Sequence, residues 1–118
     1  DRGLGLERSG TAWRSMIQAA LAADARVLLL TPTADMTQHP DYDGEDRDLL
    51  GLHAKQIRDL AAEFGTGLVD SFAAFRSHMG NHDLSDLLSW ANHPNRAGHD
   101  LIVRELLRWF PVAASPPE

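Results

Sequence analysis

The run Val27-Leu28-Leu29-Leu30-Thr31-Pro32 sets the architecture of this chain. Its consecutive apolar residues are too few for a helix and are followed by a proline, so we predict a strand over residues 27–30. Apolar residues at every position, rather than at alternate ones, are typical of a strand that is covered on both faces in a parallel sheet. Such a strand needs helices on both sides of its sheet.

The sequence around this strand supplies those helices. Apolar residues at helical spacing predict a helix that ends near residue 24, with Ser9 or Thr11 as its N-cap, and a second helix over about 49–64 that Gly65 ends. The stripe of the first helix is Trp13, Met16, Ile17, Ala20 and Leu21. His53 falls on the apolar stripe of the second helix, where a histidine is usually packed.

A second strand is predicted over Gly67-Leu68-Val69. Because a helix separates the two strands, we expect a right-handed βαβ crossover with parallel strands. Asp70 follows the second strand directly. It could act in catalysis, but capping of the next helical turn is the favoured interpretation.

Residues 33–46 form a polar, acidic loop at the carboxyl end of the first strand, the end at which open α/β sheets bind ligands. Its acidic residues raise the possibility of a calcium site: Asp35, Asp41, Asp43, Glu45 and Asp46. The loop lacks the residue register of an EF-hand, however, so a solvated loop is favoured.

Composition excludes several functional classes. The net charge is −6, Lys55 is the sole lysine, and the arginines are scattered, which is unlike a nucleic-acid-binding surface. No apolar run approaches the roughly 20 residues that a membrane span needs. The chain has no cysteine, so it carries no disulfide framework. The sequence indicates no cofactor, and localisation stays unknown.

The stretch Asn92-His93-Pro94-Asn95-Arg96-Ala97-Gly98-His99 is the best candidate for a functional element. Pro94 excludes His93 from the helical region, and Asn95 is a favourable N-cap for an apolar, periodic helix over 96–110. His93 is therefore expected to be extended, one step before a helix, with its ring free to project. A histidine in this setting can transfer protons.

The order of elements, the Val-Leu-Leu-Leu-Thr-Pro strand and the Asn-His-Pro-Asn-x-x-Gly-His element together resemble the carboxyl-terminal half of an SGNH (GDSL-type) hydrolase. The resemblance covers residues 1–112, and residues 113–118 are expected to be a tail. It implies a flavodoxin-like three-layer α/β/α fold with a parallel sheet, of which this chain would carry the last two strands. It also implies a serine esterase or acylhydrolase.

Carried over to this sequence, the catalytic histidine of the family falls on His93, and His99 becomes structural. The family usually has an aspartate three residues before this histidine, but Trp90 stands there. We therefore expect the main-chain carbonyl of Trp90 to orient the His93 ring. Asp86 is the alternative acceptor.

The Gly-Asp-Ser nucleophile motif and the oxyanion-hole blocks of the family are not found in these residues, although Asp1 could be the end of a Gly-x-Asn-Asp block. The resemblance thus implies that the nucleophile lies in a missing amino-terminal segment and that the 118-residue chain alone is inactive. We expect the chain to pack against that segment or against a second copy of itself, because the first strand would otherwise expose an apolar edge.

Two other functions compete with ester hydrolysis. One is a non-catalytic, flavodoxin-like binding module. The other is a metal site formed by His82, His93 and His99, whose spacing matches no compact zinc motif. The ester itself is left open between an acetylated sugar and a short fatty-acyl ester.

Overall fold

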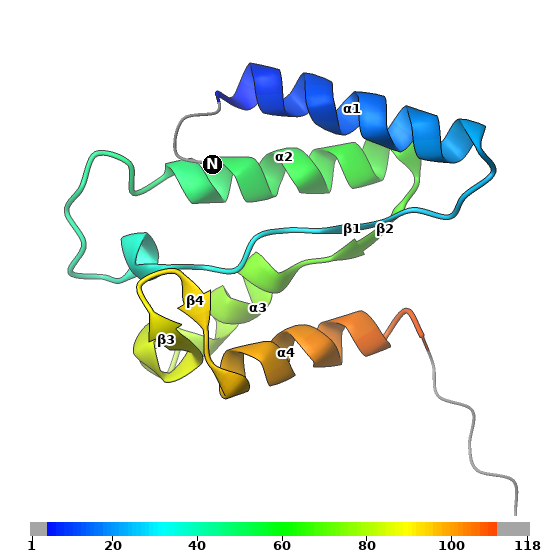
Figure 1. Ribbon diagram of the computed structural model, residues 1–118. Helices are drawn as coiled ribbons and strands as arrows, with labels where there is room; N and C mark the ends of the chain where they lie inside the picture. Colours follow the sequence, from blue (N-terminus) through cyan, green and yellow to red (C-terminus); the bar gives the residue numbers. More distant parts are fainter. Residues whose placement is uncertain (1–4, 111–118) are drawn as a thin grey trace, which may run out of the picture.

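A βαβ unit lies at the centre of the computed structural model, which describes residues 5–110 (Figure 1). Strand β1 (Leu28–Leu30), helix α2 (Leu49–Phe64) and strand β2 (Gly67–Val69) follow one another along the chain. The two strands pair in parallel. The predicted strands are thus confirmed to within one residue, and the predicted helix over 49–64 is confirmed. Gly65 ends it in the left-handed conformation, with φ of 65°.

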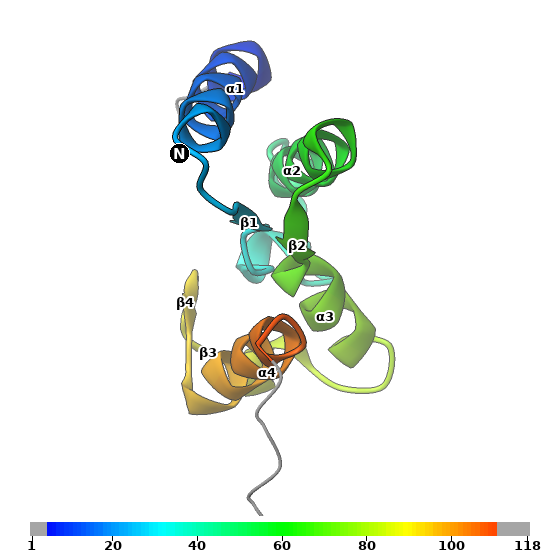
Figure 2. The same ribbon diagram turned by 90° about the vertical axis from the view of Figure 1, so that its right-hand side faces the viewer.

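Helices cover both sides of this small sheet. Helix α1 (Leu6–Ala22) packs against α2 on one side, while α3 (Ser71–His78) and α4 (Arg96–Leu107) lie together on the other (Figure 2). The mixed α/β character expected from the sequence is therefore present.

The amino-terminal end of α1 differs from the sequence prediction. Ser9 and Thr11, predicted as N-caps, both lie within the helix, which begins at Leu6 after the extended residue Gly5. A tertiary contact supports this early start: the side-chain amide of Gln56 on α2 donates to the Leu6 carbonyl at 2.7 Å.

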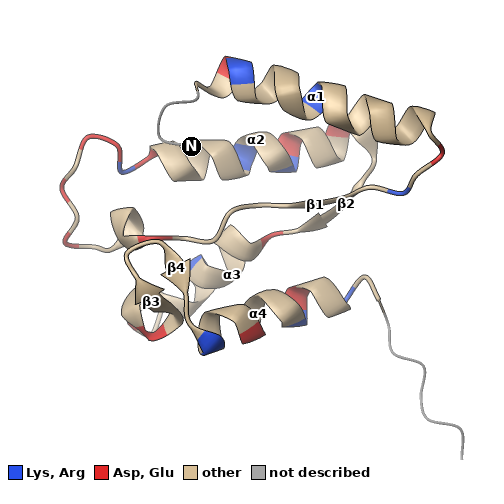
Figure 3. Ribbon diagram, in the orientation of Figure 1, with Lys and Arg blue, Asp and Glu red and all other residues tan. Residues whose placement is uncertain are grey.

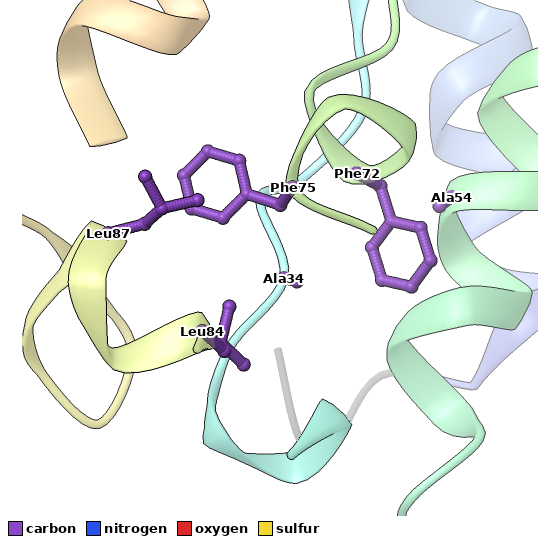
Figure 4. Close-up of a cluster of buried hydrophobic side chains, with 6 residues drawn as sticks. All are labelled: Ala34, Ala54, Phe72, Phe75, Leu84 and Leu87. Atoms are coloured by element: carbon purple, nitrogen blue, oxygen red, sulfur yellow. The ribbon is translucent and has the colours of Figure 1, made fainter. Parts of the chain in front are cut away.

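The buried side chains form two clusters, and helix α2 contributes to both. The first lies between α1, α2 and the strands and consists of Ile17, Leu29, Ile57, Leu60 and Ala61. The second joins α3 to the loop after β1 and to the short 3-10 helix η2 (Leu84–Leu87), as Figure 4 shows. Its members are Ala34, Ala54, Phe72, Phe75, Leu84 and Leu87. The second cluster supports the segments that carry the candidate site.

Strand β1 is less covered than its sequence predicts. Leu29 is buried, but Leu30 is 42% exposed. Within residues 5–110, β1 has β2 as its single partner, so its other edge is unpaired. An unpaired edge beside an exposed leucine is the surface against which further strands of a sheet can pair.

The end of α4 also departs from the expected range of 96–110. The helix ends at Leu107, and the chain turns so that the Trp109 indole N–H donates to the Leu68 carbonyl at 2.9 Å. The indole covers Gly67, where an added Cβ would lie 3.2 Å from its ring. Trp109 therefore shields the outer edge of β2. The predicted boundary at residue 112 and the tail 113–118 fall outside the described residues.

A search of the described helices for a membrane span found none that is both long and apolar enough.

Candidate functional site

His93 lies on a short antiparallel hairpin that the sequence analysis did not predict. Strands β3 (Leu88–Trp90) and β4 (His93–Pro94) pair with Trp90 directly opposite His93. The connection between these two residues is short, and Asn92 is its sole residue with a strong turn preference. That weak signal explains why pattern reasoning missed the hairpin, although it correctly predicted the extended conformation of His93.

Asn95 fixes the hairpin to the helix that follows. Its side-chain oxygen accepts from the Gly98 N–H at 3.0 Å, which confirms the predicted N-cap of α4. Its side-chain amide donates to the Asp86 carbonyl at 2.7 Å. Gly98 lies so close to η2 that an added Cβ would sit 2.3 Å from the Leu87 carbonyl oxygen. Asn95 and Gly98 therefore fix the positions of α4, η2 and the hairpin relative to one another.

The hairpin lies at the carboxyl end of β1, as Figure 1 shows. The loop after β1 contains a 3-10 turn, η1 (Met36–Gln38), and the Met36 N–H donates to the Ala91 carbonyl at 2.9 Å. This contact between residues far apart in the sequence places His93 at the edge where α/β sheets bind ligands.

A cavity of about 410 Å³ opens beside the hairpin. Its volume lies within the roughly 300–1,000 Å³ typical of small-molecule sites. Asn92 lines it from the hairpin, and the other lining residues come from α1, β1 with its loop, and α2: Ser9, Trp13, Leu30, Thr31, Pro32, Thr33, Asp35, Thr37, Asp46, Leu49, Leu50, His53 and Ile57. This described lining contains two carboxylates and no lysine or arginine.

The imidazole of His93 is exposed and makes no hydrogen bond or ion pair within residues 5–110. Orientation of this ring by the Trp90 carbonyl therefore stays a prediction. The carboxylate of Asp86, the alternative acceptor, lies 3.3 Å from Nε2 of His78. His99 is exposed on α4, where its backbone N–H takes part in the first turn of the helix.

The histidines considered as metal ligands lie in different surroundings. His82 stacks on His78 with ring centroids 4.7 Å apart, while His93 and His99 lie on β4 and α4. No group of three His, Asp or Glu side chains in the described part of the chain is placed to hold one ion. The acidic residues of the loop before α2 are spread along its length (Figure 3).

Asp70 organises the scaffold beneath the site. Its carboxylate accepts from the Ala73 N–H at 3.0 Å, the predicted cap, and also from the Thr31 hydroxyl at 3.1 Å and from Nε of Arg58 at 2.6 Å. Burial alone would raise the pKa of Asp70, but the hydrogen bonds from Arg58 and Ala73 and the charge of Arg58 outweigh it and hold this pKa below its ordinary value. The network ties the carboxyl ends of β1 and β2 together.

Asn92, Thr33 and Asp35 line the cavity, and all three lie in stretches that the sequence analysis singled out. The residues that sequence reasoning missed come from α1 and α2, for example Ser9. His53, predicted to be packed on its helix, also faces the cavity, and its Nε2 is buried without a hydrogen-bond partner among the described residues. No local pattern marked the helix residues as part of a cavity, whereas the loop 33–46 was marked by its place at the end of the first strand.

The sequence model of the GDSL-like lipase/acylhydrolase family matches residues 1–101 of the 118. The chain belongs to this family. A search of curated proteins found no match.

Several solved structures have a similar fold. A mutant of an acetyl-xylooligosaccharide esterase from Geobacillus matches with a TM-score of 0.79 and 21% identity, over 98% of this chain and 51% of that one. An alpha/beta hydrolase enzyme from the metagenome of Lake Arreo, Spain, matches with a TM-score of 0.77 and 25% identity, over 98% of this chain and 51% of that one. The chain thus spans about half the length of these structures.

Three further structures of the acetylxylan esterase from Geobacillus stearothermophilus also match. They are catalytic mutants in which alanine replaces a serine, a histidine or an aspartate. The aspartate of that enzyme precedes its histidine by three positions.

Proposed function

We propose that the full-length protein hydrolyses an acyl or acetyl ester through a serine nucleophile, and that this chain supplies the general base, His93. The observation that carries the proposal is the placement of His93. His93 is exposed on a hairpin that Met36 and Asn95 anchor, and its neighbour Asn92 lines a cavity at the carboxyl end of parallel strands. Membership of the GDSL-like family supports the choice of ester hydrolysis.

The proposed reaction uses His93 twice. Its ring first removes the proton from the serine hydroxyl as the oxygen attacks the ester carbonyl. The resulting imidazolium then gives this proton to the departing alcohol, which leaves the acyl group on the serine. His93 next removes a proton from a water that attacks this acyl-serine, and returns the proton to the serine oxygen as the carboxylic acid departs. An exposed imidazole without another hydrogen-bond partner leaves one ring nitrogen available for the serine.

The other ring nitrogen needs an acceptor that fixes the tautomer and the direction of the ring. In the acetylxylan esterase, an aspartate stands three positions before the histidine. Trp90 occupies that position here, and we assign the orienting role to its main-chain carbonyl. A neutral carbonyl stabilises the imidazolium less than a carboxylate does, so the base is expected to be weaker.

The nucleophile and the oxyanion donors belong, in this proposal, to a segment that precedes Asp1 in the full-length protein. The same segment would supply the strands that complete a flavodoxin-like three-layer sheet next to β1. The open edge of β1, the exposed Leu30 and the twofold greater length of the similar structures support this arrangement.

The test is hydrolysis of p-nitrophenyl acetate by the full-length gene product. Replacing His93 with alanine should lower kcat/KM by about 10²–10⁴-fold, the usual contribution of a general base. His99→Ala is the matched control and should keep wild-type activity, because His99 lies on the exposed face of α4. Wild-type activity in His93→Ala would overturn the proposal, and a full-length protein without esterase activity would favour a non-catalytic binding module.

The 118-residue chain alone should not hydrolyse this ester. Turnover by the isolated chain at the rate of a serine esterase would contradict the assignment of the nucleophile to another segment.

A further inference from the structure

We propose that the indole of Trp90 is a stacking platform for a sugar ring, so that the ester cleaved at this site is an acylated carbohydrate. This inference rests on the proposed function and narrows its substrate. It adds a role for the side chain of Trp90 to the role proposed for its main-chain carbonyl.

The hairpin sets Trp90 directly across from His93, the proposed general base. Trp90 and His93 are direct partners across the antiparallel pair of β3 and β4. Directly opposed residues project from the same face of a strand pair, with Cβ atoms about 4.5–5.5 Å apart. A substrate whose ester group lies at the His93 ring therefore has its alcohol or acyl part within reach of the indole.

Trp90 is not needed to hold the hairpin. Its side chain is 72% exposed, the highest fraction among the large apolar side chains of residues 5–110. The hairpin is fixed instead through main-chain and Asn95 contacts: Met36 to the Ala91 carbonyl, and Asn95 to the Asp86 carbonyl. An indole on a rigid support, exposed at the edge of a catalytic site, is available to a ligand.

The surroundings favour a carbohydrate over the other ester classes. One face of a pyranose ring consists of C–H groups that pack flat on an aromatic ring, while its hydroxyls need polar partners at the sides. The cavity next to the hairpin offers such partners in the amide of Asn92, the hydroxyl of Thr33 and the carboxylate of Asp35. The described lining contains carboxylates but no lysine or arginine, so it disfavours anionic substrates.

The experiment compares two esters in the full-length enzyme. Wild type, Trp90→Ala and Trp90→Phe are assayed on acetylated methyl glucopyranoside and on p-nitrophenyl acetate. For each variant, kcat/KM for the sugar ester is divided by kcat/KM for the aryl ester. Trp90→Ala should lower this ratio by about tenfold, mainly because KM for the sugar ester rises. Trp90→Phe should stay within about threefold of wild type, because a phenyl ring also stacks.

Trp109→Phe is the matched control, since Trp109 is half-exposed on the far edge of β2, away from the hairpin. Its ratio should equal that of wild type. An unchanged ratio in Trp90→Ala, or an equal fall in Trp109→Phe, would overturn the inference. So would a Trp90 that acrylamide does not quench in the full-length enzyme, because the indole would then be covered by protein.

A binding measurement separates this inference from the proposed function. Unacetylated methyl glucopyranoside should change the tryptophan fluorescence of the full-length protein in a saturable way, and Trp90→Ala should abolish this change. If p-nitrophenyl acetate is not hydrolysed, the proposed function fails, while saturable binding still supports the platform. Absence of binding to wild type overturns the platform even if the esterase is active.

Discussion

At the scale of single residues, the proposed reaction depends on Trp90 and His93. In the proposed reaction, Trp90 stands where the acetylxylan esterase has an aspartate, so a charge that would stabilise an imidazolium is missing from that position. What Trp90 contributes instead is a carbonyl and an exposed ring. The importance of the missing charge can be measured by placing an aspartate at position 90.

Replacing Trp90 with aspartate should preserve or raise the rate at which the full-length enzyme hydrolyses p-nitrophenyl acetate. A carboxylate opposite His93 can orient the ring and stabilise its protonated form, and this small ester has no sugar ring to lose. The measurement is kcat/KM, with Trp90→Asn as an uncharged control. A loss greater than about 100-fold would contradict a simple orienting role for this position.

Asp70 acts on stability rather than on chemistry. Its pKa is lowered in the folded protein, so its stabilising contribution is present above the ordinary pKa of about 4 and is lost as pH falls through the lowered value. Asp70→Asn keeps a capping acceptor but loses the ion pair with Arg58. Urea unfolding should show a loss of about 1–3 kcal/mol at pH 7 that shrinks on acidification below about pH 4.

Asp59→Asn is the control for that series. Asp59 pairs with Lys55 on the exposed surface of α2, four residues away, so the variant should change the free energy of unfolding by less than about 0.5 kcal/mol. Equal effects of the two substitutions would show that the Asp70 network adds nothing beyond a surface ion pair.

At the scale of elements, the geometry of the site depends on how closely α4 approaches η2. Gly98 permits this approach, because its missing side chain leaves room for the Leu87 carbonyl. Asn95 then links the helix to the hairpin that carries His93. Displacement of α4 would therefore move the base as well as weaken the fold.

Gly98→Ala should destabilise the protein by about 1–3 kcal/mol, because the added methyl group would lie 2.3 Å from a backbone oxygen that cannot move freely. It should also lower kcat by shifting the hairpin. Gly51→Ala, in the first turn of α2, is the matched control. Its Cβ would meet the Phe72 ring at an ordinary 3.6 Å, so that variant should be neutral or more stable by up to about 1 kcal/mol. Thermal unfolding that ranks the two variants in the opposite order would contradict this account.

At the scale of the whole molecule, the exposed edge of β1 is the main unsatisfied feature of the described residues. The sheet has its two strands in the order β1-β2, and Leu30 faces solvent at the open side. Apolar strands of parallel sheets are normally covered on both faces, so this surface favours association.

The 118-residue chain should therefore associate with copies of itself when it is prepared alone. Leu30→Lys should reduce this association, because a charge on an edge strand opposes pairing. Leu52→Lys is the control, since Leu52 is 47% exposed on α2, away from the strand edge. Small-angle scattering that shows a compact, stable monomer of 13.0 kDa for the unmodified chain would contradict the prediction.

Local sequence by itself determined the βαβ unit, the extended His93 and the caps at Asp70 and Asn95. Each of these depends on interactions within a few residues: an unbroken apolar run, a proline that restricts its predecessor, and a side chain that accepts from a nearby N–H. Such interactions are present in the sequence and do not require knowledge of the fold.

The tertiary structure decided the rest of the candidate site. Met36, in the loop after β1, anchors the hairpin through the Ala91 carbonyl, and Asp86 contacts His78 where α3 and η2 pack together. The cavity combines side chains from α1, α2, the loop after β1 and the hairpin. These contacts join residues that are distant in the chain, so their free energy depends on packing, which no local pattern in the sequence reports.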